Sequence, residues 1–94
     1  MSSGLRMDFE TLQLADYDAV CEALNFPSDW PEGLLVHGSR NVDGKLRVYD
    51  VWESRAQFDE FVATRLGAAL GQALGERAEQ PVVVEEQLHS FYAR

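Results

Sequence analysis

The chain has 94 residues and a mass of 10.6 kDa, enough for one domain but not for two independent cores. Sixteen acidic and eight basic side chains give a net charge of −8, which repels polyanions and anionic membranes, so we expect no nucleic-acid partner. One cysteine and two histidines are too few for a disulfide framework or a tetrahedral zinc site, so we expect no metal.

The start of the chain carries no targeting signal. Residues 1–4 are small and polar, without the basic and apolar regions of a signal peptide. We expect them to be disordered or vector-derived, and the single domain to span residues 5–92. No apolar run reaches the roughly 18 residues that cross a bilayer. We therefore expect a cytoplasmic protein that does not bind membranes.

The first quarter of the chain predicts a strand and then a short helix. Apolar and polar residues alternate from Leu5 to Leu14, as in a half-buried strand. Asp16 suits a helix N-cap. The residues after it have the spacing of an amphipathic stripe: Tyr17, Val20, Cys21 and Leu24. Pro27 ends this helix by Phe26 and opens a loop that contains Trp30.

A β-hairpin is predicted in the middle of the chain. Asp43 and Gly44 form a dipeptide typical of tight hairpin turns. The strand-like runs on either side of it are residues 33–40 and 45–52. A two-residue turn sets Leu35 opposite Trp52.

The register of this hairpin places a histidine near a carboxylate. The two-residue turn sets His37 opposite Asp50, but it also sets Arg40 opposite Arg47, and like charges in that position destabilise a strand pair. A four-residue turn would instead set His37 opposite Val48. Side chains alternate along strands, so either register leaves the same residues on one sheet face: His37, Val48, Asp50 and Trp52.

A second helix and a last strand complete the pattern. Ser54 and Gln57 have the spacing of a capping box, and a broad apolar stripe at helical spacing follows them until Gly75. A polar connection then ends at Pro81, and a strand is predicted from Val82 to about Tyr92.

The order of elements predicts an α+β fold. It is β-α-β-β-α-β, the pattern of the ferredoxin-like sandwich, in which a four-stranded antiparallel sheet carries both helices on one face. Apolar residues occupy both parities of the predicted strands, so the uncovered face would be an apolar patch. We therefore expect a homodimer with the open sheet faces packed together.

Three segments resemble small bacterial proteins of the dimeric α+β barrel superfamily, which includes the antibiotic biosynthesis monooxygenases: residues 30–37, 47–59 and 65–67. The most specific part is the Asp-Val-Trp-Glu-Ser run at 50–54. The resemblance implies that ferredoxin-like protomers associate into a barrel, with a small-molecule cavity between sheet and helices. It further implies a cofactor-independent monooxygenase-like enzyme acting on a small aromatic or polyketide-type substrate.

One branch of that superfamily is disfavoured. Its haem-degrading members ligate iron with a histidine on the second helix, and residues 54–74 contain no histidine. We therefore expect no cofactor.

The candidate catalytic residues are His37 and Asp50. A carboxylate beside an imidazole fixes its tautomer and raises its basicity, which suits a general base for a phenolic or enolic proton. Trp52 is the candidate for stacking on a flat substrate ring, and Trp30 for closing one end of the cavity. The alternatives are a structural His37, hydrogen-bonded within the sheet or sealed in the dimer interface, and tryptophans that only pack.

Other residues are expected to be structural. His89 and Tyr92 have opposite parity on the last strand, so we expect His89 near the dimer interface. Cys21 is expected in the core. The alternative functions are a non-catalytic small-molecule-binding dimer and a barrel protein that has kept the fold without the reaction.

Overall fold

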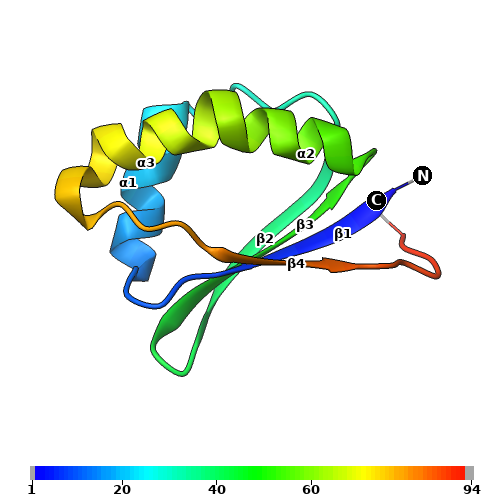
Figure 1. Ribbon diagram of the computed structural model, residues 1–94, viewed down its shortest axis with the longest axis horizontal. Helices are drawn as coiled ribbons and strands as arrows, with labels where there is room; N and C mark the ends of the chain where they lie inside the picture. The colour runs from blue at the N-terminus through cyan, green and yellow to red at the C-terminus, as the bar shows by residue number, and fades with distance from the viewer. Residues whose placement is uncertain (1, 93–94) are drawn as a thin grey trace.

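The computed structural model describes residues 2–92. It contains a four-stranded antiparallel sheet in the order β2-β3-β1-β4, and all the helices lie on one face of it (Figure 1). The predicted ferredoxin-like α+β architecture is confirmed. The elements are β1 (Ser3–Asp8), α1 (Leu14–Leu24), β2 (Leu34–Val42), β3 (Lys45–Trp52), α2 (Arg55–Phe61), the π-helical segment η1 (Val62–Leu66), α3 (Gly67–Leu74), the 3₁₀ turn η2 (Gly75–Arg77) and β4 (Val82–Glu86).

Strand β1 is shifted toward the N-terminus relative to the prediction. It starts at Ser3, so Ser3 and the buried Gly4 belong to the sheet and not to a disordered start; Met1 lies outside the described residues. The strand ends at Asp8 instead of Leu14. Beyond that point the backbone N–H of Thr11 donates to the Glu79 carboxylate at 2.9 Å, so this side chain takes the place of a strand partner.

The N-cap of α1 is Gln13, and the prediction of Asp16 as the cap is wrong. Asp16 is the third residue of the helix, and its carboxylate accepts the Gln13 backbone N–H at 2.8 Å. The carboxylate therefore stabilises the first turn from inside the helix. The helix ends at Leu24, followed by Asn25 in the left-handed conformation with φ of 54°.

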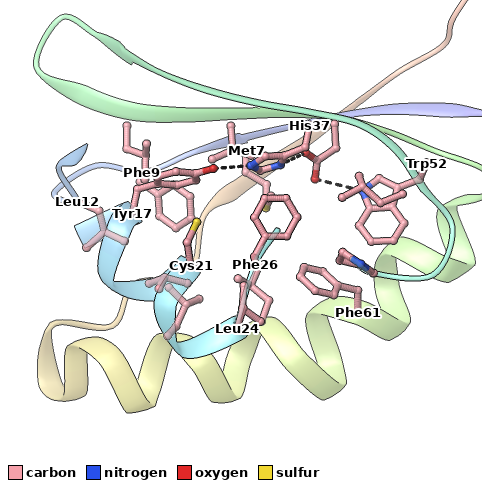
Figure 2. Close-up of a pocket in the computed structure, with 18 residues that line it drawn as sticks. Met7, Phe9, Leu12, Tyr17, Cys21, Leu24, Phe26, His37, Trp52 and Phe61 are labelled. Carbon is pink, nitrogen blue, oxygen red and sulfur yellow. Dashed lines mark hydrogen bonds and ion pairs between the residues drawn. The ribbon is translucent and has the colours of Figure 1, made fainter. Parts of the chain in front are cut away.

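The hairpin has the two-residue turn. Asp43 and Gly44 have φ of 53° and 80°, as a type I′ turn requires. The resulting register places His37 opposite Asp50, on the sheet face that meets the helices (Figure 2). The register also sets Arg40 opposite Arg47. Arg47 pairs with Asp8 of β1, Nε to Oδ1, at 2.6 Å, which offsets the like-charge contact.

A β-bulge at Leu35 changes the pairing at the start of β2. Leu34, and not Leu35, lies opposite Trp52, so the prediction for this pair is wrong. One extra residue reverses the alternation beyond the bulge. As a result Leu34 is 6% exposed and lines the helix-facing side with His37, whereas Leu35 is 38% exposed.

The second predicted helix runs as one continuous helical segment through α2, η1 and α3 (Figure 1). Ser54 is its N-cap, as predicted, and the Ser54 hydroxyl accepts the Gln57 backbone N–H at 3.2 Å. Gly75 follows its last residue with φ of 57°. The sequence did not predict the π-helical turn in its middle.

The last strand is shorter than predicted. β4 ends at Glu86, and the segment to Tyr92 is irregular. The side chain of Leu88 reaches back over Gly4 on the side of the sheet away from the helices. His89 and Tyr92 are exposed and lie beyond the strand, so strand parity does not relate them.

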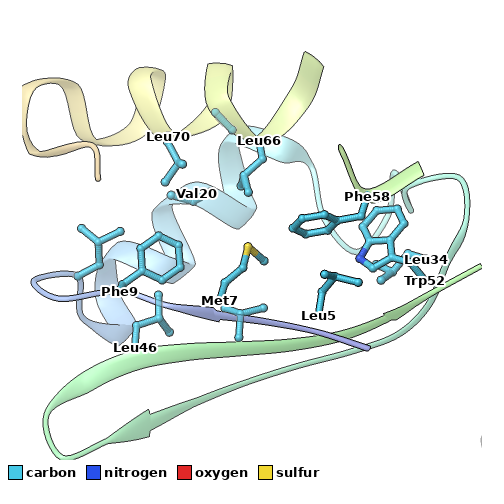
Figure 3. Packing of buried hydrophobic residues seen from close by; sticks show 13 residues of the cluster. Leu5, Met7, Phe9, Val20, Leu34, Leu46, Trp52, Phe58, Leu66 and Leu70 are labelled. Atoms are coloured by element: carbon cyan, nitrogen blue, oxygen red, sulfur yellow. The ribbon is translucent and has the colours of Figure 1, made fainter. Parts of the chain in front are cut away.

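The core fills the space between the sheet and the helices (Figure 3). Leu5 and Met7 of β1 point into it, and Leu66 and Leu70 reach it from the long helix. Trp52 and Phe58 are its largest fully buried side chains. Cys21 is partly buried beside this layer.

The open sheet face is mixed, and not the continuous apolar patch that the sequence predicts. Alternation along the paired strands assigns both apolar and charged side chains to it. The apolar ones are Val36, Val42, Tyr49, Val51, Val82 and Val84, and the charged ones are Arg6, Asp8, Arg40, Lys45, Arg47 and Glu86. Asp8 pairs with both Arg6 and Arg47.

Candidate active site

A chain of hydrogen bonds links four side chains from three elements, on the face of the sheet that meets the helices. Asp50 Oδ1 lies 2.6 Å from His37 Nδ1, and His37 Nε2 lies 2.6 Å from the Tyr17 hydroxyl. The Trp52 indole N–H donates to the second carboxylate oxygen of Asp50 at 3.1 Å. Figure 2 shows these contacts as a continuous row. Because the row joins β2, β3 and α1, it depends on the packing of sheet against helix.

The buried carboxylate determines the protonation of the histidine. Asp50 is 2% exposed, and both of its oxygens have donors. A proton on His37 Nδ1 gives the carboxylate its donor, and Nε2 then accepts the Tyr17 O–H. Burial raises the pKa of Tyr17 to about 12, so its hydroxyl is protonated at neutral pH. The row therefore runs as a directed chain of donors from Tyr17 through His37 to Asp50.

An apolar cavity lies beside this chain, between the sheet and the helices. Its volume is about 60 Å³. His37 and Asp50 contribute to its lining, and most of the remaining wall is aliphatic or aromatic, including Met7, Phe9, Phe61 and Leu66. Sites for drug-sized ligands are usually about 300–1,000 Å³. An engineered apolar cavity of about 150 Å³ binds benzene. The space is therefore too small for an aromatic ring unless a side chain moves.

Phe26 is the aromatic ring that reaches His37 from a loop. Its ring lies edge-on to the imidazole, with the centroids 4.8 Å apart at 70°. On its other side it stacks with Trp30 at 5.2 Å. Phe26 lines the cavity, whereas Trp30 lies outside the lining, is 45% exposed and donates its indole N–H to the Leu34 carbonyl at 2.7 Å.

The structure brings three of the four candidate residues together. His37, Asp50 and Trp52 line one cavity, and Trp30 is separated from it by Phe26. Trp52 is fully buried and packs edge-on against Phe58, which leaves its ring face little room for stacking on a ligand.

Two residues of the site were missed from the sequence. Tyr17 falls on the apolar stripe of α1, where a tyrosine is typical of the core, and Phe26 comes directly before Pro27 at the end of the helix. A buried tyrosine hydroxyl requires a hydrogen-bond partner. For Tyr17, this requirement was the sequence feature that could have indicated a place in the site.

Residues 2–92 offer little support for nucleophilic thiol chemistry or for a metal site. Burial raises the pKa of the Cys21 thiol, which disfavours the nucleophilic thiolate. Within this range no cluster of three or more His, Cys, Asp or Glu side chains is placed to hold a metal ion. None of the helices there is both long enough and apolar enough to cross a bilayer.

Comparisons with known proteins identify the fold. No protein-family model matches the sequence, and no curated protein matches it. Among solved structures, a candidate antibiotic biosynthesis monooxygenase from Chloroflexus aurantiacus has a TM-score of 0.69 at 12% identity, over 99% of this chain and 98% of that one. A variant of SnoaB, a cofactor-independent oxygenase from Streptomyces nogalater, has a TM-score of 0.54 at 14% identity, over 99% and 96%.

A third similar structure is a dimeric protein of unknown function with a ferredoxin-like fold, from Bacteroides fragilis. Its TM-score is 0.61 at 11% identity, over 93% of this chain and 95% of that one. At such low identities the likeness concerns the fold, and at that level it confirms the resemblance to the antibiotic biosynthesis monooxygenase-like proteins.

Proposed function

We propose that the protein is a cofactor-independent monooxygenase-like enzyme that acts on a small phenolic substrate. The observation that carries this proposal is the Asp50–His37–Tyr17 chain at the wall of an apolar cavity. The shared fold with a cofactor-independent oxygenase supports it. In this assignment Tyr17 and His37 are catalytic, and Asp50 is a positioning residue that holds the imidazole.

The chain would remove the substrate proton in a concerted transfer. The phenolic proton passes to the Tyr17 oxygen while the Tyr17 proton passes to His37 Nε2. The Asp50 carboxylate stabilises the imidazolium that results. Because the pKa of Tyr17 is about 12, a free tyrosinate is unfavourable, and the two transfers are coupled. An apolar wall around the substrate keeps water from competing for these protons.

The substrate anion itself would reduce dioxygen. The phenolate gives electrons to dioxygen, and a carbon–oxygen bond forms at a ring carbon that bears hydrogen. The hydroperoxide then eliminates water and leaves a carbonyl, so phenol plus dioxygen gives quinone plus water. The balance requires no outside reductant and no bound cofactor.

Oxygen uptake tests the proposal. Dihydroxybenzenes, naphthols and anthrone would be offered in chelator-treated buffer under isotopically labelled dioxygen. We expect labelled oxygen in the product, and a rate that falls about 100-fold or more in His37→Ala. Absence of uptake with every substrate, or a rate that His37→Ala leaves unchanged, contradicts the proposal.

A second candidate is a non-catalytic small-molecule-binding protein. It is favoured by one observation: both ring nitrogens of His37 already have partners, so the chain is complete without a substrate. Ligand binding without oxygen uptake would support this alternative.

We also propose that the protein forms a homodimer through its open sheet faces. The exposed Val82 and the half-buried Val36, Tyr49 and Val84 on that face support this, and so does the fold shared with a dimeric protein.

A further inference from the structure

We propose that the Phe26 ring occupies the place of a ligand's aromatic ring, and that the site takes a single-ring phenol when this side chain rotates out. The inference rests on the proposed function for the role of His37, but it concerns only what binds there.

The contacts of Phe26 are those expected of a bound ring. It meets the imidazole edge-on at 4.8 Å and stacks with the Trp30 indole on its other side at 5.2 Å. Both contacts are preferred aromatic geometries that a ligand ring would keep. Phe26 is only partly buried, whereas the core ring of Phe58 is 1% exposed. Figure 2 shows the Phe26 ring in the cavity beside His37.

The surrounding backbone allows the side chain to move alone. The Phe26 backbone N–H donates to the Cys21 carbonyl at 2.9 Å, and Arg65 Nη2 donates to the Leu24 carbonyl at 3.2 Å. Arg65 also pairs with Asp29 at 3.2 Å. These bonds fix the loop on both sides of Phe26, but none holds its ring. The ring leaves by rotation about its own side-chain bonds.

The volume of the cavity, together with the space left by the Phe26 ring, limits the size of the ligand. A rotated Phe26 vacates a space with the shape of one benzene ring. The existing cavity adds about 60 Å³ beside Tyr17 and His37, enough for a hydroxyl and a small substituent. A second fused ring does not fit, because a benzene-sized cavity alone takes about 150 Å³. The site is therefore matched to single-ring phenols, with the hydroxyl directed to the Tyr17–His37 pair.

Removal of the ring should expose the site directly. Phenol would be titrated into Phe26→Ala, with nuclear magnetic resonance detection of ¹⁵N-labelled histidines. Only two histidines are present, and the exposed His89 serves as the internal reference. We expect His37 alone to shift, and the affinity for phenol to exceed that of the wild type about tenfold or more.

Phe61→Ala is the matched control. It removes the same kind of ring from another part of the wall of the same cavity, where Phe61 packs on Trp52 at 5.4 Å. Little gain in phenol affinity is expected there. Phe26→Leu keeps the core filled if the alanine variant unfolds, and an intermediate gain is expected.

Several outcomes overturn the inference: equal gains in Phe26→Ala and Phe61→Ala, equal shifts of His37 and His89, no gain in a folded Phe26→Leu, or binding of naphthol as tightly as phenol. The two proposals fail separately. Phenol binding to Phe26→Ala without oxygen uptake by the wild type contradicts only the enzymatic function. Oxygen uptake by the wild type without phenol binding to Phe26→Ala contradicts only the role of Phe26.

Discussion

His37 is held by neighbours on both sides of its ring. The strand pairing supplies Asp50, and helix α1 supplies Tyr17, each at 2.6 Å. Its side chain is 16% exposed, so water has little access to compete with these partners. The proton that a substrate delivers would therefore reach this imidazole through the tyrosine hydroxyl.

A spectroscopic titration would detect the buried tyrosine. The raised pKa of Tyr17, about 12, means that the folded protein favours its neutral form. The resulting stabilisation is complete below about pH 10, the usual pKa of tyrosine, and is lost as the pH rises toward 12. We expect a late component in the tyrosinate absorbance that is missing in Tyr17→Phe. An unchanged titration in that variant would show that Tyr17 is not the late group.

The buried carboxylate should be sensitive to a neutral replacement. Asp50→Asn keeps the shape of the side chain but leaves the His37 or the Trp52 donor without an acceptor. We expect a loss of about 1–3 kcal/mol in the free energy of unfolding, measured by chemical denaturation. Asp59→Asn, which alters an exposed carboxylate on α2, is the control and should cost less than about 0.5 kcal/mol. Equal losses in the two variants would contradict a structural role for the chain.

Three of the five residues of the candidate site were predictable from the sequence. His37, Asp50 and Trp52 share a face because alternation along strands has a period of two, whichever turn closes the hairpin. The place of Tyr17 and Phe26 in the site was not predictable, because their contacts with His37 depend on how a helix and a loop pack against the sheet. No local pattern encodes that placement.

At the scale of elements, predictions from local chemistry were confirmed where a turn or cap needs specific residues. The hairpin at Asp43 and Gly44 is one example, although the sequence left its turn length open, and the Ser54 cap is another. No turn or cap residue in the sequence indicates the bulge at Leu35 or the early end of β4. Val82 and Tyr92 suit a strand at either end of the predicted run, but pairing with β1 stops at Glu86.

The Ser54 cap allows a direct test of the long helix. Ser54→Ala removes the acceptor for the Gln57 backbone N–H, and we expect a loss of about 1 kcal/mol in the free energy of unfolding. Ser54→Asp should retain most of the stability, because aspartate also caps helices. If Ser54→Ala unfolds at the same denaturant concentration as the wild type, the cap contributes nothing.

At the scale of the molecule, the proposed dimer can be tested by substituting two neighbouring residues whose side chains point to opposite faces of the sheet. Val84 lies on the open face of β4, and Val83 on the face toward the helices. We expect sedimentation of the wild type at micromolar concentration to give about twice the 10.6 kDa of one chain. Val84→Asp should shift the protein to monomer, because it places a charge in the interface.

Val83→Asp is the control for that experiment. It adds the same charge one residue away, and the dimer should persist. A monomeric wild type, or equal dissociation in both variants, would contradict association through the sheet.

The three arginines on the open face give the molecule an electrical polarity. Among the paired residues of the described strands, Arg6, Arg40 and Arg47 share that face with Lys45 and with two carboxylates, Asp8 and Glu86, so most of the negative charge of this acidic chain lies elsewhere. Two copies that approach sheet to sheet keep their most negative surfaces farthest apart. Low ionic strength should therefore favour this approach over one that brings two acidic surfaces together.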